Sequence, residues 1–371
     1  TANYGFKASV QITASHNPAE YNGMKVSREN ALPVGLDTGL GQIKEWIESG
    51  RECVPAAVRG SVHQMDIKAD YLAFLLKYKG DWSSLKIAMD VSNGMASLFV
   101  RDIFGDQPAY IYEEMDGRFP NHEPNPLVQK NVEDLKKLVA ETGADIGVIF
   151  DGDADRVMFV DENSRFISPD LMIAVLGHYF LEERGEKGYI HQDIRSSKAV
   201  GEYLAPMGGV MNTWRVGRAY AALKLREIDG VYGGELAGHY YFRDFFYSDS
   251  GLLAAILIIN VVAKMKAQGV SLSQLIARIE KYQNSGEINF RLEDKKGAMD
   301  AVRDYFTASE QSTAYMDFDG YRVEFPDWWF NIRPSNTEPY LRFLCEATSQ
   351  ELLEEKVAKV REILTERFGA K

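Results

Sequence analysis

The run DGDADR at residues 151–156 constrains this chain more than any other feature, because it places three carboxylates at alternate positions. Apolar segments precede it at residues 145–150 (DIGVIF) and follow it at residues 157–160 (VMFV), and both are predicted to be strands. Carboxylates at the end of a buried strand repel one another strongly unless a cation lies among them. Small residues separate the three aspartates, so the backbone can curl and direct them toward one point. The pattern predicts a cation site at the end of a sheet strand.

The ligand chemistry of this loop favours magnesium. Asp151, Asp153 and Asp155 offer hard oxygen ligands, and Mg²⁺ often shares its site with a substrate phosphate. We therefore expect these three residues to bind Mg²⁺ beside a phosphate group. The alternative is an acidic surface loop, which the apolar flanks and the closing Arg156 disfavour.

Composition limits the partners of the protein. The net charge of −12 argues against nucleic acid, and it requires a local basic pocket for any anionic substrate. The most apolar stretch, residues 252–263, is too short to span a bilayer and predicts a buried helix rather than a membrane anchor. Cys53 and Cys345 form no CxxC pattern, so we expect reduced thiols and a cytoplasmic protein.

From Leu85 onward, strand and helix patterns alternate. Strands are predicted at residues 85–91 and 109–112, and a helix capped by Asn131 is predicted to end at Gly143. The acidic loop follows this helix. Such alternation predicts a mostly parallel sheet covered by helices.

A second α/β alternation begins at Pro169, with predicted helices at residues 171–184 and 252–267 and a short strand at 188–191. The pattern of predicted helices and strands changes after Gly286. The remaining predicted elements are strands at 315–318, 321–325 and 328–333 and a helix at 351–368. These elements predict an antiparallel sheet with helices on one face.

The motif TASHNP at residues 13–18 lies in a polar, turn-rich segment and is followed by YNGMK at 21–25. Ser15 can be a nucleophile, a phosphorylated residue or a turn former, and the sequence leaves these alternatives open. Lys25 can neutralise a phosphate or can be a solvated surface lysine.

Two further motifs contain ligand-binding residue types. In GELAGH (234–239), Glu235 can accept hydrogen bonds from two neighbouring sugar hydroxyls, while an ordinary loop is the alternative. In RPSNTEP (333–339), a forked arginine donor stands beside hydroxyl and amide groups, a composition typical of a phosphate cradle. A polar turn between strands is the alternative for this second motif.

These four motifs, in this order, resemble those of the α-D-phosphohexomutases, the family of phosphomannomutases and phosphoglucomutases. The stretches 239–251 and 327–342 are most similar to bacterial phosphomannomutase-type members. The resemblance implies an α/β multidomain architecture, with three related α/β domains, the first incomplete, and a C-terminal α+β domain around a central cleft. The implied domains, each with one motif loop, are residues 1–61, 62–165, 166–283 and 284–371.

The resemblance also implies a role for each motif residue. Ser15 would carry a phosphate whose oxygen joins the three aspartates around Mg²⁺. The transferring group would be surrounded by His16, Lys25 and Arg156. The substrate would be bound by Arg218, Glu235 and His239, and its non-reacting phosphate would be held by Arg333, Ser335, Asn336 and Thr337.

The implied activity interconverts mannose 6-phosphate and mannose 1-phosphate through a phosphoserine enzyme and a 1,6-bisphosphate intermediate. Glucose or mannose 1,6-bisphosphate would then be an activator as well as the intermediate. The alternatives are a phosphoglucomutase or dual-specificity enzyme, a phosphoglucosamine mutase, a Mg²⁺-dependent phosphatase and a non-catalytic sugar-phosphate binder. The expected partner is a hexose phosphate, without nucleic acid or membrane, and the protein is expected to be a monomer or homodimer.

Three departures from the family pattern bear on the site. Ala237 stands where many members have a serine, and Arg218 stands where dual-specificity members often have a histidine. Thr1 lies only fourteen residues before Ser15, so we expect an incomplete first domain that lacks an early arginine. We also expect residues 1–25 to be poorly packed or displaced from Asp151.

Overall fold

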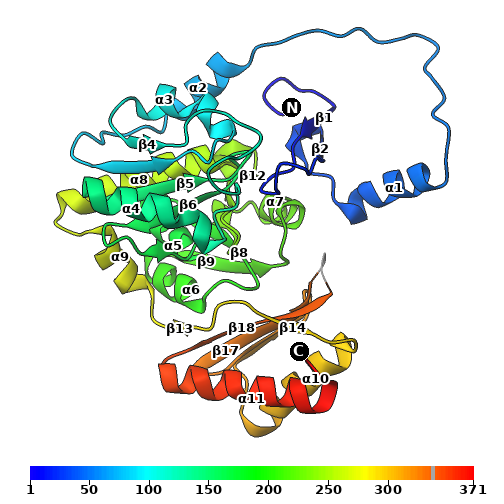
Figure 1. The fold of residues 1–371 in the computed structure, drawn as a ribbon, viewed down its shortest axis with the longest axis vertical. Helices are drawn as coiled ribbons and strands as arrows, with labels where there is room; N and C mark the ends of the chain where they lie inside the picture. The colour runs from blue at the N-terminus through cyan, green and yellow to red at the C-terminus, as the bar shows by residue number, and fades with distance from the viewer. Residues whose placement is uncertain (336–338) are drawn as a thin grey trace.

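The computed structural model describes residues 1–335 and 339–371. Figure 1 shows a central α/β body, an N-terminal hairpin beside it and a C-terminal sheet with two helices below it. The whole arrangement is therefore α/β, with one antiparallel unit at the C-terminus, as the sequence predicts.

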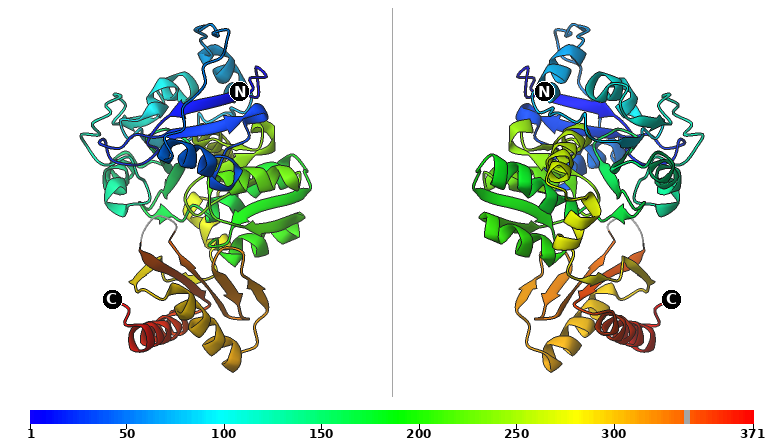
Figure 2. Two further views of the ribbon diagram at one scale, coloured as in Figure 1. Left: turned by 90° about the vertical axis from the view of Figure 1, so that its right-hand side faces the viewer. Right: turned by 90° about the vertical axis from the view of Figure 1, so that its left-hand side faces the viewer.

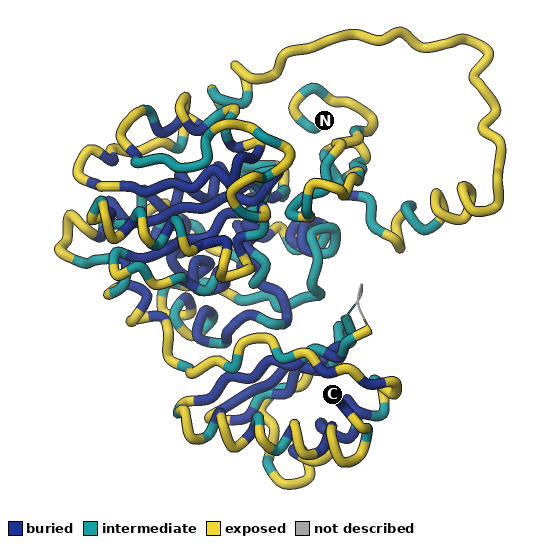
Figure 3. Tube along the Cα trace, viewed as in Figure 1, coloured by how far each residue is buried: buried dark blue, intermediate teal, exposed yellow. Residues whose placement is uncertain are grey.

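The N-terminal region contains a two-stranded antiparallel sheet, β1 (Ala8–Ile12) and β2 (Met24–Arg28). Two 3₁₀ turns and helix α1 (Leu40–Glu48) follow. Residues 51–67 form no helix or strand and are exposed throughout, as Figure 3 shows for the long stretch that leads to α2 (Lys68–Leu76). This region buries few apolar side chains, so contacts with the rest of the chain must hold it in place.

The first central sheet has the strand order β4-β3-β5-β6-β7. Its strands are β3 (Ile87–Asp90), β4 (Ala109–Ile111), β5 (Ile146–Phe150), β6 (Val157–Asp161) and β7 (Phe166–Ile167), with helices α3 (Val100–Phe104) and α4 (Glu133–Thr142). The sheet is parallel through β4, β3 and β5, as predicted, but β6 runs antiparallel to its neighbours β5 and β7. The short acidic loop returns the chain beside β5, which leaves no room for a crossover helix.

The second central sheet, ordered β12-β11-β10-β8-β9, repeats this connectivity. Its strands are β8 (Gly188–Asp193), β9 (Gly209–Trp214), β10 (Tyr232–Gly234), β11 (Tyr240–Phe242) and β12 (Ser248–Asp249). Its helices are α5 (Leu171–Gly177), α6 (Lys198–Leu204), α7 (Arg218–Glu227), α8 (Gly251–Ala267) and α9 (Leu272–Ile279). In both sheets the third and fourth strands along the chain are antiparallel neighbours, and the turn between them carries the motif.

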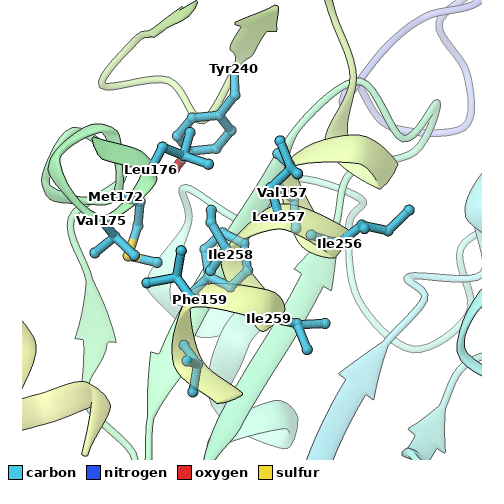
Figure 4. Close-up of a cluster of buried hydrophobic side chains, with 14 of the residues drawn as sticks. Val157, Phe159, Met172, Val175, Leu176, Tyr240, Ile256, Leu257, Ile258 and Ile259 are labelled. Carbon is cyan, nitrogen blue, oxygen red and sulfur yellow. The ribbon is translucent and has the colours of Figure 1, made fainter. Parts of the chain in front are cut away.

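The two central units share one hydrophobic core. Helix α8 lies in this core, and Figure 4 shows its residues Ile256 to Ile259 among Val157 and Phe159 of β6 and Met172 and Val175 of α5. Among the described residues no single helix is long and apolar enough to cross a membrane, although α8 and α9, bent by 102° relative to each other, pass that test as a pair. The shared core fixes the two motif turns relative to each other.

The C-terminal unit has its own core and a sheet of antiparallel pairs, which confirms the prediction for this part of the chain. Its strands are β13 (Gln283–Asn284), β14 (Ile288–Arg291), β15 (Ala314–Met316), β16 (Tyr321–Glu324), β17 (Trp328–Pro334) and β18 (Tyr340–Ala347). Helices α10 (Lys295–Ser309) and α11 (Gln350–Phe368) cover one face of the sheet (Figure 2). Strands β13, β14 and β18 and helix α10 were not predicted from the sequence.

Two local predictions need correction. Asn131 is not a helix cap: it lies in a 3₁₀ turn, its side chain donates to the carbonyl of Asn125 (3.0 Å), and α4 begins without a side-chain cap. The helix expected at 171–184 is α-helical only to Gly177 and continues as a π-helical turn. Gly143 does end α4, in the left-handed conformation that favours glycine.

Candidate active site

The serine motif lies directly against the acidic loop. The hydroxyl of Thr13 donates to Asp153 Oδ2 over 2.8 Å. A side chain at Gly152 would approach the carbonyl oxygen of Ser15 to 2.5 Å, so only glycine allows the two backbones to lie this close. The expected displacement of residues 1–25 from Asp151 is therefore wrong. Polar bonds to the acidic loop hold the hairpin, and these do not require a large apolar core of its own.

Ser15 occupies an unusual backbone conformation. Its φ is 58°, which is uncommon for a residue other than glycine and is a form of strain that often occurs at functional sites. The Ser15 N–H donates to Thr13 Oγ1 (2.8 Å), and His16 Nδ1 lies 3.3 Å from Ser15 Oγ. Burial, together with the nearby Arg156 guanidinium, lowers the pKa of His16 to about 4. A neutral imidazole therefore stands beside the serine hydroxyl.

The three aspartates converge as predicted. One ligand oxygen from each of Asp151, Asp153 and Asp155 lies within 4.8 Å of the others. Each residue also has one buried oxygen without a hydrogen-bond partner, namely Asp151 Oδ2, Asp153 Oδ1 and Asp155 Oδ1. Burial, with the repulsion of Asp155 and Asp153, raises the pKa of Asp151. An all-oxygen set with unused buried oxygens fits a hard divalent cation.

Lys25 neutralises the outer side of this cluster. Its ammonium donates to Asp153 Oδ2 over 2.6 Å and also to Asp155 Oδ2. Burial by itself disfavours the charged ammonium, but these two carboxylates raise the pKa of Lys25 above its usual value. Lys25 therefore remains a cation, and it occupies the Oδ2 atoms while the Oδ1 atoms stay available.

A chain of charged groups joins the acidic loop to the GELAGH loop. Arg156 Nε donates to His239 Nε2 (3.0 Å), and the other ring nitrogen of His239 lies 2.8 Å from Asp249 Oδ2. Arg218 Nε donates to Asp249 Oδ1 over 2.8 Å. Asp249 was not predicted as a site residue, although it lies in the stretch 239–251 that carries part of the resemblance. A hollow of about 330 Å³ is lined by Asp153, Asp155, Arg218 and Asp249 among other residues, which is room for a small molecule.

Glu235 is almost fully buried, with 1% of its surface exposed. Its Oε1 accepts from the hydroxyl of Tyr241 (2.5 Å), and its Oε2 accepts from the N–H of Gly217 (3.1 Å). Burial raises the pKa of the Glu235 carboxyl. The carboxylate is thus held from two sides in the turn between β10 and β11.

The structure describes part of the RPSNTEP motif (333–339), the predicted phosphate cradle. Arg333 is buried, and its Nε donates to Asp319 Oδ1 over 3.3 Å. Asp319 in turn accepts from the N–H of Val216 (2.8 Å), which links the C-terminal unit to the segment that precedes α7. The Ser335 N–H donates to the carbonyl of Tyr340 (2.9 Å). The remaining predicted clamp residues, Asn336 and Thr337, lie outside the described residues.

All four motifs lie between antiparallel neighbouring strands: β1–β2, β5–β6, β10–β11 and β17–β18. A single β-bridge between Arg156 and His239 joins the second and third of these turns. The first three motifs meet in one constellation of a serine, clustered carboxylates and several cations. Such a constellation is suited to phosphoryl transfer, which depends on positioning and charge stabilisation.

Comparison with known families identifies this fold. Residues 1–52, 69–164 and 168–282 match, in turn, the phosphoglucomutase/phosphomannomutase alpha/beta/alpha domains I, II and III. Residues 287–363 match the phosphoglucomutase/phosphomannomutase C-terminal domain. The fold and the site thus define a four-domain phosphohexomutase. The boundaries predicted at 61/62, 165/166 and 283/284 stay predictions.

Curated relatives agree with this class. The chain is 37% identical over 364 residues to a Xanthomonas campestris protein named "Phosphohexose mutases", with 96% of this chain and 79% of the relative covered. It is 36% identical over 376 residues to a phosphomannomutase of Salmonella montevideo, with 98% of this chain and 81% of that protein covered. The chain belongs to the phosphoglucomutase/phosphomannomutase family and is a phosphohexomutase, an isomerase-class phosphotransferase of carbohydrate metabolism.

Solved structures show the same architecture. A phosphoglucomutase/phosphomannomutase family protein from Burkholderia thailandensis has a TM-score of 0.83 at 27% identity, with 96% of this chain and 76% of that chain covered. An N-acetylphosphoglucosamine mutase from Aspergillus fumigatus, solved with GlcNAc-6P and magnesium, has a TM-score of 0.66 at 12% identity, with 96% and 88% covered. The second likeness concerns the fold alone.

Proposed function

We propose that this phosphohexomutase interconverts mannose 6-phosphate and mannose 1-phosphate through a phosphorylated Ser15. The observation that carries the proposal is the contact between the Ser15 turn and the three converging aspartates, made by the Thr13–Asp153 hydrogen bond and the close approach at Gly152. The phosphomannomutase relatives support mannose as the sugar.

The proposed reaction has two half-reactions. Phosphoserine gives its phosphoryl group to a hydroxyl of the hexose phosphate, which yields free Ser15 and a 1,6-bisphosphate. The bisphosphate then turns over and returns its other phosphoryl group to Ser15, which yields the isomeric monophosphate. Glucose or mannose 1,6-bisphosphate would enter this cycle directly and so act as an activator.

Residues of the chain stabilise the charge that develops on the transferring group. Arg156 and Lys25 bring positive charge to the Ser15 turn and would act there as charge stabilisers. His16, neutral and 3.3 Å from Ser15 Oγ, orients the serine oxygen.

Asp151, Asp153 and Asp155, with a phosphoserine oxygen, would hold Mg²⁺. When bound, the ion would supply positive charge during phosphoryl transfer. Their buried oxygens without a hydrogen-bond partner support this assignment, because burial of such oxygens is costly unless a cation lies close to them.

The intermediate must bind in two opposite orientations. Glu235 would accept hydrogen bonds from neighbouring sugar hydroxyls that both orientations present, and His239 and Arg218 would line the same side. Arg333 and Ser335, with Asn336 and Thr337, would hold the phosphate that is not reacting.

A phosphoglucomutase or dual-specificity enzyme is the second candidate. Mannose and glucose differ at the C2 hydroxyl, and Glu235 would bind other hydroxyls of the sugar. Three alternatives rank below it: phosphoglucosamine mutase activity, a Mg²⁺-dependent phosphatase and a non-catalytic binder.

The two cysteines are free, with Cys53 exposed, which supports the cytoplasm as the proposed compartment. The proposed state is a monomer or homodimer.

Replacement of the serine tests the mechanism. Ser15→Ala is expected to lower kcat by several orders of magnitude, because no other group would hold the phosphoryl between half-reactions. Ser27→Ala, on β2 of the same hairpin, is the control and should keep activity. Coupled assays with mannose 1-phosphate, glucose 1-phosphate and glucosamine 1-phosphate measure both activity and preference. Near-normal turnover of Ser15→Ala would reject the mechanism, and a preference for glucose 1-phosphate would reject the substrate.

A further inference from the structure

Two adjacent tyrosines on β11 are fully buried but have different partners. The hydroxyl of Tyr241 donates to Glu235 Oε1 over 2.5 Å. The hydroxyl of Tyr240 donates to the backbone carbonyl of Pro169 over 2.9 Å, inside the core that α5 and α8 share. Successive side chains of a strand point to opposite faces of the sheet, so only the Tyr241 hydroxyl reaches Glu235.

We propose that Tyr241 is a positioning residue for sugar recognition, whose hydroxyl fixes the carboxylate of Glu235. This inference rests on the proposed role of Glu235 and adds to it a residue that acts only through that carboxylate.

The geometry fixes the carboxylate from two independent elements. The terminal torsion of a glutamate is broad, so a single hydrogen bond leaves the carboxylate free to rotate. Here Tyr241 on β11 binds Oε1, and the N–H of Gly217 before α7 binds Oε2 (3.1 Å). A carboxylate has about four lone-pair positions. Two remain for the neighbouring hydroxyls of a sugar.

Tyr241 itself has little freedom to move. Its ring centroid lies 6.1 Å from that of His239 and 6.3 Å from that of His191, and the ring is fully buried. Burial, reinforced by the nearby Glu235 carboxylate, raises the pKa of Tyr241 well above its usual value. The phenol therefore keeps its proton and remains a hydrogen-bond donor to the glutamate.

Tyr241→Phe removes this hydroxyl and keeps the ring. Hydrogen bonds to charged acceptors are the stronger kind, so we expect kcat/KM for the hexose phosphate to fall roughly tenfold, mostly through a higher KM. The matched control is Tyr240→Phe, which also loses one buried hydroxyl bond but leaves Glu235 untouched. Tyr240→Phe should lower the unfolding midpoint about as much as Tyr241→Phe does, and it should keep kcat/KM within about twofold of wild type. Equal kinetic effects in the two variants would overturn the inference.

A double-mutant cycle separates this inference from the proposed function. Glu235→Gln alone tests the sugar-binding role of Glu235, and an unchanged kcat/KM would overturn that role together with the role of Tyr241. If Glu235→Gln lowers kcat/KM, Tyr241→Phe should add less than about twofold on that background, since it acts through the carboxylate. A full, additive loss in the double variant would overturn the positioning role and leave the role of Glu235 intact.

Discussion

Removal of Lys25 gives the sharpest test of the acidic cluster. The ammonium lies 2.6 Å from Asp153 Oδ2 and also binds Asp155, and only 21% of the lysine side chain is exposed. Two unit charges 4 Å apart interact by about 4 kcal/mol at an effective dielectric constant of about 20. Loss of one partner of a buried pair costs roughly 3 to 5 kcal/mol. Lys25→Met should therefore lower the free energy of unfolding by about 3 kcal/mol in the presence of a chelator.

Magnesium should reverse much of this loss. Lys25 and a divalent cation compete electrostatically for the same carboxylates, so the variant should bind Mg²⁺ more tightly than wild type does. Binding at one hundred times the dissociation constant stabilises a protein by about 2.7 kcal/mol. The stability difference between Lys25→Met and wild type should therefore shrink as Mg²⁺ is added, although activity stays low because the transferring phosphate has lost a cation.

The assay compares urea unfolding of wild type and variant in chelator and in saturating Mg²⁺, with Mg²⁺ affinity measured by calorimetry. Lys7→Met is the matched control, because Lys7 pairs with Glu29 on the same hairpin (3.4 Å) but is exposed, and exposed pairs contribute little. Equal losses for the two variants in chelator, or an identical Mg²⁺ response of Lys25→Met and wild type, would refute the reasoning.

Two further predictions concern other parts of the chain. Arg333→Ala should raise KM and lower kcat, with a combined loss of transition-state stabilisation of about 2 kcal/mol. The variant should also release more bisphosphate into solution. An unaltered KM, with no bisphosphate release in product analysis, would contradict the role of Arg333 in holding the phosphate. Burial raises the pKa of Glu346 from its usual 4.5 to about 7. The folded state then holds this proton to higher pH than the unfolded state, so stability falls by about 3 kcal/mol between pH 4.5 and pH 7. Glu346→Gln should flatten that slope in unfolding curves taken at pH 5 and pH 8.

The sequence predicted the elements whose signal is local. The run 252–267, which is apolar except for Asn260, Lys264 and Lys266, predicted helix α8 nearly to the residue, because a helix that is apolar on most sides must be buried. The periodic apolar residues of 351–368 predicted α11 equally well. By contrast, β18 carries Arg342 and Glu346 among its apolar residues, and without a clean alternation the sequence did not predict it.

Within the site, the sequence identified the side chains that each short turn presents. The spacing of Asp151, Asp153 and Asp155 is set by the backbone of one loop, so their convergence followed from that loop alone. The partners that hold these side chains are different. Asp249 binds Arg218 and lies beside His239, and Tyr241 binds Glu235. Both residues lie in the stretch 239–251, but the sequence did not assign either of them a role in the site.

Only the tertiary structure decided how the turns meet. Thr13 and Asp153 are 140 residues apart in the chain, and Arg156 and His239 are 83 apart, yet each pair is in hydrogen-bond contact. Residues 1–61 offer few apolar strand-like runs, so the sequence predicts that residues 1–25 are poorly packed or displaced from Asp151. The structure instead shows the hairpin bound to the acidic loop through polar contacts. The sequence by itself determined which chemical groups this enzyme offers. The packing of two sheets on a common core, with polar bonds to the N-terminal hairpin, determined that those groups face one another.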